Sequence, residues 1–257
     1  MAEVLLSARQ LTKRFGGLAA VNGVSLDLWR GRIHAVIGPN GAGKSTLTNL
    51  LSGDLPPSSG QVHLGATSIT GWPPERISRQ GLGRSYQKTN IFLPLTVHEN
   101  VRLAAQSRDA QQPWNPLRWW QDTREAAING KAANERLETA ITLSGLENRR
   151  TAIAGALSHG EQRQLEIAMT LATEPQVLLL DEPLAGMGVA EAERMVDLLQ
   201  RIKPAHAILL VEHDMDAVFA LADQLTVMVN GEVIAQGLPA EVRADAAVQA
   251  AYLGEDH

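Results

Sequence analysis

Residues 38–45, GPNGAGKS, combine three glycines, a lysine and a serine at a spacing suited to phosphate binding. The glycines let the backbone curl so that successive N–H groups converge on an anion, and the first free N–H groups of a following helix would add to them. Lys44 would place its charge between the β- and γ-phosphates, and the Ser45 hydroxyl is suited to ligate Mg²⁺. An apolar strand before this loop and a helix after it would complete a site for ATP or another nucleoside triphosphate. The residues predicted to hold the nucleotide here are Gly38, Pro39, Asn40, Gly41, Ala42, Gly43, Lys44, Ser45 and Thr46.

A second half-site is expected at residues 176–183, QVLLLDEP. Four apolar residues predict a buried strand, and two carboxylates follow at its C-terminal end, where ligands of open α/β sheets bind. Asp181 would hold the magnesium ion, and Glu182 would polarise an attacking water. Taken alone, this pattern also fits a strand that ends in a solvated acidic turn. Together with the phosphate loop, it indicates ATP hydrolysis.

Between these two motifs and upstream of the acidic strand lies LSHGEQ, residues 157–162. This stretch and the acidic strand that follows it resemble the signature region of ABC-type ATPases. The resemblance implies that two ATPase subunits pair head to tail, with Ser158, Gly160 and Glu161 of one covering the γ-phosphate held by the other. His159 stands where the family commonly has a glycine. A local interpretation is also open, because Ser158 and Glu161 have the spacing of a helix capping box.

Further positions match the family residue by residue. Phe15 is where the family has an aromatic residue that stacks on adenine, although such a side chain on its own is more often part of a core. Val21 is where an apolar residue touches the ribose or base. Gln87 resembles the glutamine that reaches magnesium and the attacking water, and His213, in VEHD, resembles the histidine that contacts the γ-phosphate. Gly188 departs from the family, which has an aspartate there.

Within the family, residues 81–101, 181–188 and 211–255 resemble the ATP-binding subunit of bacterial branched-chain (hydrophobic) amino-acid importers. That resemblance implies a permease with which residues 88–99 would make contact, a second ATPase subunit that is identical or related, and, indirectly, a periplasmic solute-binding protein. The chain would then sit on the cytoplasmic face of the inner membrane. The cofactors would be ATP and Mg²⁺. The tryptophans Trp114, Trp119 and Trp120 would either pack within a lobe or line a partner surface.

Three alternatives stay open at this stage. The chain could serve a related ABC system, for urea or amide uptake or for lipopolysaccharide export, because no residue in it contacts the solute. It could be a soluble ABC ATPase that acts on DNA or the ribosome, although it lacks a second cassette and a heptad arm. It could also be a nucleotide kinase with a lid, which would leave LSHGEQ and VEHD unexplained.

The composition of the chain argues against several kinds of protein and site. The net charge is −5, from 23 basic and 28 acidic residues, which argues against bulk binding of nucleic acid. The sequence holds no cysteine, hence neither disulfides nor thiolate metal sites. We expect no signal peptide, and no apolar run reaches the 18 residues typical of a membrane span. Any membrane association would therefore depend on a partner.

The expected order of strands and helices indicates how these motifs are positioned. Strands are expected at residues 4–6, 24–28, 33–37, 177–181, 207–212, 225–229 and 232–236, and helices at 45–53, 160–173, 189–202 and 214–221. This alternation predicts an α/β fold with a mainly parallel sheet. The family resemblance adds an N-terminal antiparallel β subdomain and a helical subdomain. We expect an ATP-binding lobe at 1–95 and 160–257, and a helical lobe at 96–159 that carries the signature at its end.

Overall fold

The computed structural model of the chain describes residues 3–86, 90–107 and 123–253. The chain forms two compact units. The first comprises Met1–Gln87, Pro175–Ala185 and Leu199–His257, and the second comprises Lys88–Glu174 and Gly186–Leu198. Among the described residues, no helix combines the length and the apolar character needed to cross a membrane.

The first unit begins with an antiparallel sheet. Its strands are β1 (Val4–Phe15), β2 (Leu18–Trp29), β4 (Ser59–Leu64) and β5 (Thr67–Ser68), in the spatial order β2-β1-β4-β5. Gly16 and Gly17 form the turn that joins β1 to β2, and Gly16 adopts a positive φ of 57° there. This sheet is the expected N-terminal antiparallel subdomain.

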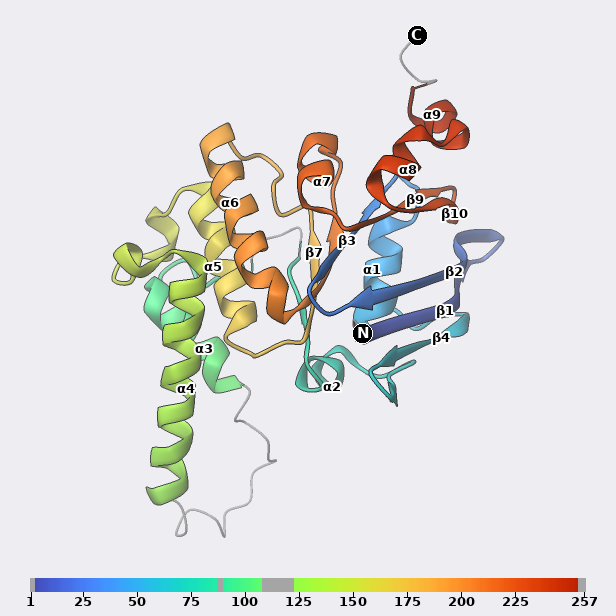
Figure 1. The fold of residues 1–257 in the computed structure, drawn as a ribbon. Coiled ribbons are helices and arrows are strands. Elements are labelled where there is room, and N and C mark those ends of the chain that lie inside the picture. Colours follow the sequence, from blue (N-terminus) through green and yellow to red (C-terminus); the bar gives the residue numbers. More distant parts are fainter. Residues whose placement is uncertain (1–2, 87–89, 108–122, 254–257) are drawn as a thin grey trace. The chain divides into compact units, whose positions relative to one another are not determined.

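A six-stranded central sheet carries the phosphate loop (Figure 1). Its spatial order is β10 (Glu232–Gly237), β9 (Gln224–Val229), β3 (Arg32–Ile37), β8 (Ala207–Val211), β7 (Val177–Asp181) and β6 (Leu82–Arg84). All neighbours pair in parallel except β10, which is antiparallel to β9. The predicted α/β fold with a mainly parallel sheet is confirmed.

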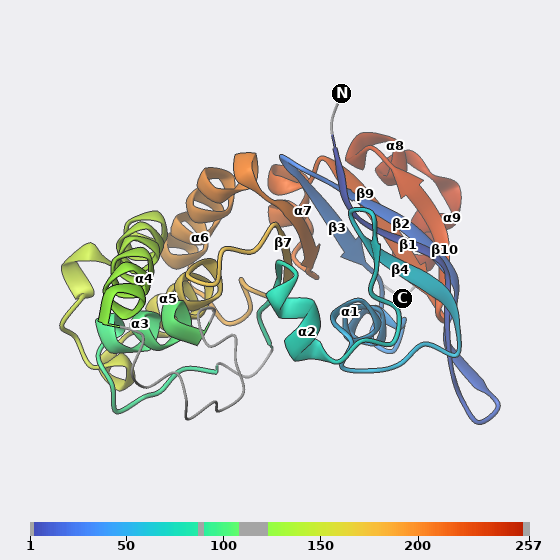
Figure 2. The same cartoon turned by 90° about the horizontal axis from the view of Figure 1, so that it is seen from below.

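Helices cover both faces of the central sheet. In order along the chain, the helices of this unit are α1 (Lys44–Ser52), α2 (Pro74–Arg79), the 3₁₀ turn η4 (Lys203–Ala205), α7 (Met215–Leu221), α8 (Pro239–Ala244) and α9 (Ala246–Leu253). Alternate residues of β3 enter different cores: Val36 packs with α1 and the antiparallel sheet, whereas Ala35 and Ile37 pack with α7 and α8. Figure 2 shows α1 and α8 on opposite sides of β3 and β9. The strand that leads into the phosphate loop is therefore buried on both faces, as parallel strands are.

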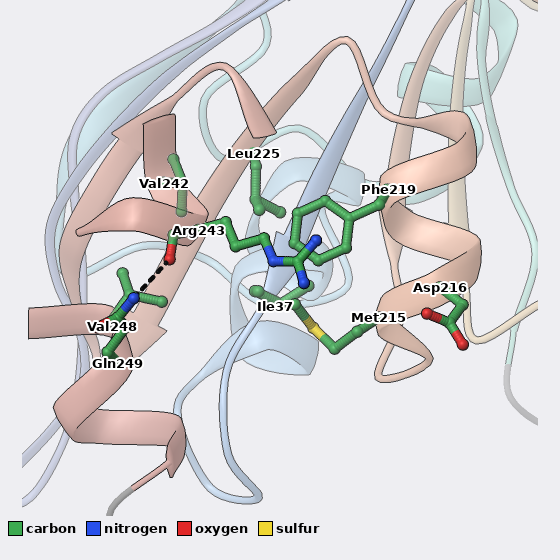
Figure 3. Close-up of a pocket in the computed structure, with 9 residues that line it drawn as sticks. All are labelled: Ile37, Met215, Asp216, Phe219, Leu225, Val242, Arg243, Val248 and Gln249. Atoms are coloured by element: carbon green, nitrogen blue, oxygen red, sulfur yellow. Dashed lines mark hydrogen bonds between the residues drawn. The ribbon is translucent and has the colours of Figure 1, made fainter. Parts of the chain in front are cut away.

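The C-terminal helices leave a gap above the sheet. A cavity of about 290 Å³ opens between the end of β3, α7, α8 and α9, with a mainly aliphatic and aromatic lining (Figure 3). The Arg243 guanidinium lies over the Phe219 ring at 5.2 Å from its centroid, which packs α8 against α7. This contact joins α8 to α7 within the unit that carries the phosphate loop.

The second unit is helical. It contains α3 (Val97–Ser107), α4 (Thr123–Ser144), the 3₁₀ turns η2 (Glu147–Arg149) and η3 (Ala154–Ala156), and α5 (His159–Leu171). Helices α3, α4 and α5 pack on one another (Figure 1). Their buried apolar residues include Val101, Leu137 and Leu165. Helix α6 (Val189–Ile202) starts in this unit and ends in the first one.

Candidate functional site

The strand register of the central sheet places three candidate segments at one edge. Val36 of β3 pairs with Val211 of β8, and Val211 pairs in turn with Asp181 of β7. Because these strands are parallel, the phosphate loop, the acidic pair and the segment that contains His213 all leave the sheet at the C-terminal ends of neighbouring strands. The structure thus brings together, within the first unit, motifs separated by more than 170 positions in the sequence.

The phosphate loop runs from the end of β3 to the start of α1. Gly43 is the N-cap of α1 with a φ of 101°, and a Cβ at this position would come within 2.3 Å of the Ala20 carbonyl oxygen. A Cβ on Gly38 would come within 2.1 Å of the Met228 carbonyl oxygen. These approaches require glycine at both positions, because backbone carbonyls cannot move aside as a flexible side chain can. The loop is therefore held in shape by its neighbours.

Lys44 turns back over this loop. Its Nζ donates hydrogen bonds to the carbonyl oxygens of Gly38, at 2.6 Å, and Pro39, at 3.1 Å. Burial lowers the pKa of Lys44 below its usual value, while the negative charges of Glu182 and Asp181 oppose that change. These two carbonyl oxygens hold the Lys44 side chain in place in the absence of a nucleotide. When a nucleotide binds, phosphate oxygens would replace them as acceptors.

The acidic pair has two different environments. Asp181 is buried at the end of β7, where its N–H donates to the Ser85 hydroxyl and its carboxylate lies 4.0 Å from the Arg84 guanidinium. Glu182 is only partly buried and has a left-handed backbone, with a φ of 49°. Its N–H donates to the Val211 carbonyl oxygen at 2.8 Å. The chain therefore turns at Glu182, directly after β7 ends at Asp181.

Glu212 is a buried carboxylate that sequence reasoning missed. It follows β8 directly and precedes His213, whose side chain is exposed. One carboxylate oxygen accepts the Leu184 N–H at 2.9 Å and the other accepts the His213 N–H at 3.2 Å. Burial raises the pKa of Glu212, and these two N–H donors oppose the rise. The signal for it in the sequence was an acid placed directly after a fully apolar strand.

Arg84 links β6 to the end of α1. Its side chain is buried and forms an ion pair with Asp54 at 2.6 Å, and it also donates to the Ser52 hydroxyl at 2.7 Å. The same guanidinium faces Asp181, as noted above. This cation therefore offsets negative charge at the strand end that would hold the metal. It was not among the predicted site residues, because its partners lie about 30 and 97 positions away.

The predicted capping box opens α5 in the second unit. The Ser158 hydroxyl accepts the Glu161 N–H at 3.3 Å, and the Glu161 carboxylate accepts the Ser158 N–H at 3.0 Å. Arg149 holds that carboxylate through an ion pair of 2.7 Å. This prediction from local spacing is confirmed, and the start of α5 has the geometry of an anion-binding helix terminus.

A second carboxylate lies at the same helix start. The Ser158 hydroxyl donates to a Glu191 carboxylate oxygen at 2.7 Å, and a Cβ on Gly160 would lie 2.8 Å from the carboxyl carbon of Glu191. The hydrogen bond from Ser158 lowers the pKa of Glu191. Any phosphate that approached Ser158 and Gly160 would have to displace this side chain. Gly188, which stands where the family has aspartate, accepts the Glu191 N–H at 2.9 Å through its carbonyl oxygen.

The remaining predicted residues differ in accessibility. Phe15, at the end of β1, is 49% exposed, and the Lys13 ammonium lies over its ring, 5.3 Å from the centroid, so its stacking on adenine stays a prediction. Val21 is 0% exposed and belongs to the core beneath the antiparallel sheet, so its contact with a nucleotide stays a prediction. Gln87 and the three tryptophans Trp114, Trp119 and Trp120 lie outside the described residues.

Comparison with known proteins decides the family. A family model described as "ABC transporter" matches residues 21–185. The chain belongs to the ABC transporter family. A model described as "Branched-chain amino acid ATP-binding cassette transporter" also matches residues 232–257. As an ATP-binding cassette, the chain is an ATPase, the activity characteristic of this family.

Individual relatives cover the whole cassette. The "High-affinity branched-chain amino acid transport ATP-binding protein LivG" of Escherichia coli is 37% identical, over 99% of this chain and 100% of the relative. BraF of Pseudomonas aeruginosa, with the same description, is also 37% identical, over 99% of this chain and 100% of the relative. Among solved structures, the ADP conformation of an ATP-binding cassette from an ABC transporter is 30% identical with a TM-score of 0.81, covering 99% of this chain and 100% of that one. The resemblance expected from the sequence is confirmed.

Proposed function

We propose that this cassette hydrolyses ATP to power an importer of branched-chain or other hydrophobic amino acids. The observation that carries the proposal is the full-length similarity to LivG and BraF, which are named for that transport. The family model that matches the C-terminal 26 residues, 232–257, supports the same solute class. Residues 232–257 contain none of the residues predicted to bind the nucleotide, so this second match adds support beyond ATP binding alone.

The nucleotide would lie along the sheet edge described above. Lys44 would leave the carbonyl oxygens of the loop and contact the β- and γ-phosphates, and Phe15 would stack on adenine. Glu182 would hold and polarise the attacking water, with His213 beside the γ-phosphate. Gln87, which precedes the helical lobe, 96–159, would reach the same water. The negative charges of Glu182 and Asp181 already act on the Lys44 ammonium without a nucleotide, which supports a common site for the three side chains.

Magnesium fits the oxygen donors at this edge. The exposed Ser45 lies in the first turn of α1, and the buried Asp181 is the last residue of β7. Hard oxygen ligands of this kind, combined with phosphate oxygens and water, are what Mg²⁺ prefers. We infer that these two residues would hold the ion, which would neutralise phosphate charge during hydrolysis.

Hydrolysis would require a second cassette. Ser158, Gly160 and Glu161 of one subunit would contact the γ-phosphate bound by the other, after Glu191 has moved away from Ser158. In the importers that the sequence resembles, the partner is a related but different ATPase, so we propose a heterodimer. Together with a permease that residues 88–99 would contact, and a periplasmic solute-binding protein, this pair would work at the cytoplasmic face of the inner membrane.

Transport in reconstituted vesicles tests the proposal. The cassette would be purified with the proteins that accompany it in detergent extracts of the membrane, and the complex would be placed in liposomes that enclose ATP and Mg²⁺, with the solute-binding protein added outside. We expect uptake of labelled leucine with the parent chain and its loss with the Glu182→Gln variant. Uptake of urea or short amides without leucine, or export of lipopolysaccharide, would contradict the amino-acid assignment. ATPase stimulation by DNA without any permease would favour a soluble role instead.

A further inference from the structure

Glu212 connects two loops that leave neighbouring strands. It is 1% exposed, and its carboxylate accepts N–H groups from Leu184, 28 residues upstream, and from His213. A buried carboxylate is unfavourable unless hydrogen bonds satisfy it. Here both oxygens are occupied by backbone donors, one from the loop after β7 and one from the loop after β8.

The carboxylate continues the pairing between β7 and β8 beyond the ends of the strands. Asp181 and Val211 form the last pair of the ladder, and the Glu182 N–H then donates to the Val211 carbonyl oxygen at 2.8 Å. Pro183 has no N–H, so the next donor along the loop is that of Leu184, which is only 7% exposed. The Glu212 side chain supplies the acceptor for this buried donor.

The turn so held contains the residue to which we assign the water-polarising role. Glu182 has a φ of 49°, a conformation uncommon for a residue with a Cβ, so neighbouring contacts must keep it there. The Ala185 N–H closes the turn onto the Glu182 carbonyl oxygen at 3.2 Å. Without its anchor at Leu184, this short turn would lose one of the two described hydrogen bonds that hold it to β8 and Glu212.

We propose that Glu212 is a positioning residue for ATP hydrolysis, which fixes Glu182 relative to His213 by holding the turn at 182–184 against the end of β8. The inference rests on the proposed roles of Glu182 and His213. Glu212 itself touches neither phosphate nor water in this scheme. Its contribution is to keep two groups from different strands at a constant separation.

The number of acceptor oxygens on residue 212 predicts a graded series of effects among variants at this position. Glutamate offers one acceptor oxygen to each of the two N–H donors, glutamine offers one oxygen in total, and alanine offers none. Glu212→Gln can keep the bond to Leu184 and lose the one to His213, whereas Glu212→Ala loses both. Glu241→Ala is a matched control, because Glu241 also accepts a backbone N–H, that of Leu238, but at the exposed start of α8.

Hydrogen exchange of the full-length chain reads out the turn directly. We expect the Leu184 amide to exchange about tenfold faster in Glu212→Ala than in the parent, because a buried donor loses its acceptor. Exchange in Glu212→Gln should stay within about threefold of the parent, and Glu241→Ala should not change it. Unchanged exchange at Leu184 in Glu212→Ala would overturn the proposal, whatever the function of the chain.

ATPase kinetics of the complete transporter complex then separate positioning from mere stability. We expect Glu212→Ala to lower kcat about tenfold or more with little change in the KM for ATP, and Glu212→Gln to recover most of the rate. Equal kcat values for the parent and Glu212→Ala, despite faster hydrogen exchange at Leu184, would also overturn the proposal that Glu212 is a positioning residue. A parent complex without ATPase activity would refute the proposed function instead, while the exchange result would still decide whether Glu212 holds the turn.

Discussion

His34, in the middle of β3, should make the stability of the first unit depend on pH. The side chain is 3% exposed, with Nδ1 3.3 Å from the Asp27 carbonyl oxygen and Nε2 2.7 Å from the Thr226 hydroxyl. A carbonyl oxygen only accepts, so Nδ1 carries the proton and Nε2 of the neutral ring accepts from Thr226. Burial lowers the pKa of His34 from 6.5 to about 4, against the opposing hydrogen bond and charge of Asp27.

The sign and size of the effect follow from linkage. Because the folded-state pKa lies below the unfolded one, the unfolded chain binds the proton first, so stability is complete above about pH 6.5 and falls as the pH drops toward 4. The full difference corresponds to about 3.4 kcal/mol, at about 1.36 kcal/mol per pKa unit. Between pH 7.5 and pH 5, the part that is lost comes to about 2 kcal/mol.

Urea unfolding followed by circular dichroism at pH 7.5 and pH 5 measures this loss. Burial also lowers the pKa of His206, which acts in the same direction, so the parent must be compared with a His34→Gln variant. Glutamine can donate to Asp27 and accept from Thr226 but does not titrate. We expect the parent to lose about 2 kcal/mol more than the variant between the two pH values. Equal losses of unfolding free energy in both proteins would contradict the conclusion that His34 is buried in its neutral form.

Three further predictions concern the nucleotide site. Lys44→Ala should weaken ATP binding by about 10- to 100-fold in calorimetric titration, since charge-assisted hydrogen bonds to phosphate are lost, whereas the exposed Lys131→Ala should bind as the parent does. Glu182→Gln should keep ATP affinity but slow hydrolysis by about two to four powers of ten and accumulate a closed dimer; hydrolysis at the parent rate would show that another group is the base. Glu191→Ala should free the Ser158 hydroxyl and lower the apparent KM for ATP of the assembled ATPase pair by about threefold, and a higher KM would mean that Glu191 assists closure.

Local spacing was sufficient to predict the strand and the helix on either side of residues 38–43. The strand that precedes it and the helix end at Gly53 are confirmed, because a left-handed glycine stops a helix without help from distant residues. The capping box of Ser158 and Glu161 is likewise contained within four positions. The central strands were recognisable since parallel strands buried on both faces appear as continuous apolar runs.

Other elements gave no such signal. The strand predicted at residues 4–6 extends to Phe15, and the extent was wrong because register shifts after Ala8 and around Leu11 interrupt the alternation of buried and exposed residues. Helices α8 and α9 were not predicted, since each is short and their helical periodicity is weak. Strand β6 has three residues, one of them a glycine, and exists through its pairing with β7.

Contacts across long sequence separations could not be predicted. Glu212 and Leu184 are 28 positions apart, and Ser158 and Glu191 are 33 apart. Nothing in the residue types identifies those partners. They become neighbours only through the order of strands in the sheet and the return of the chain after β7.

The path of the chain has a practical consequence for engineering. The helical unit is built from Lys88–Glu174 and Gly186–Leu198, and α6 continues without a break from it into the other unit. A recombinant fragment that spans only 88–174 would therefore omit Glu191, the acceptor for the Ser158 hydroxyl. Swapping this unit between transporters requires two grafted segments and a junction inside a helix, where the helical phase on both sides must be preserved.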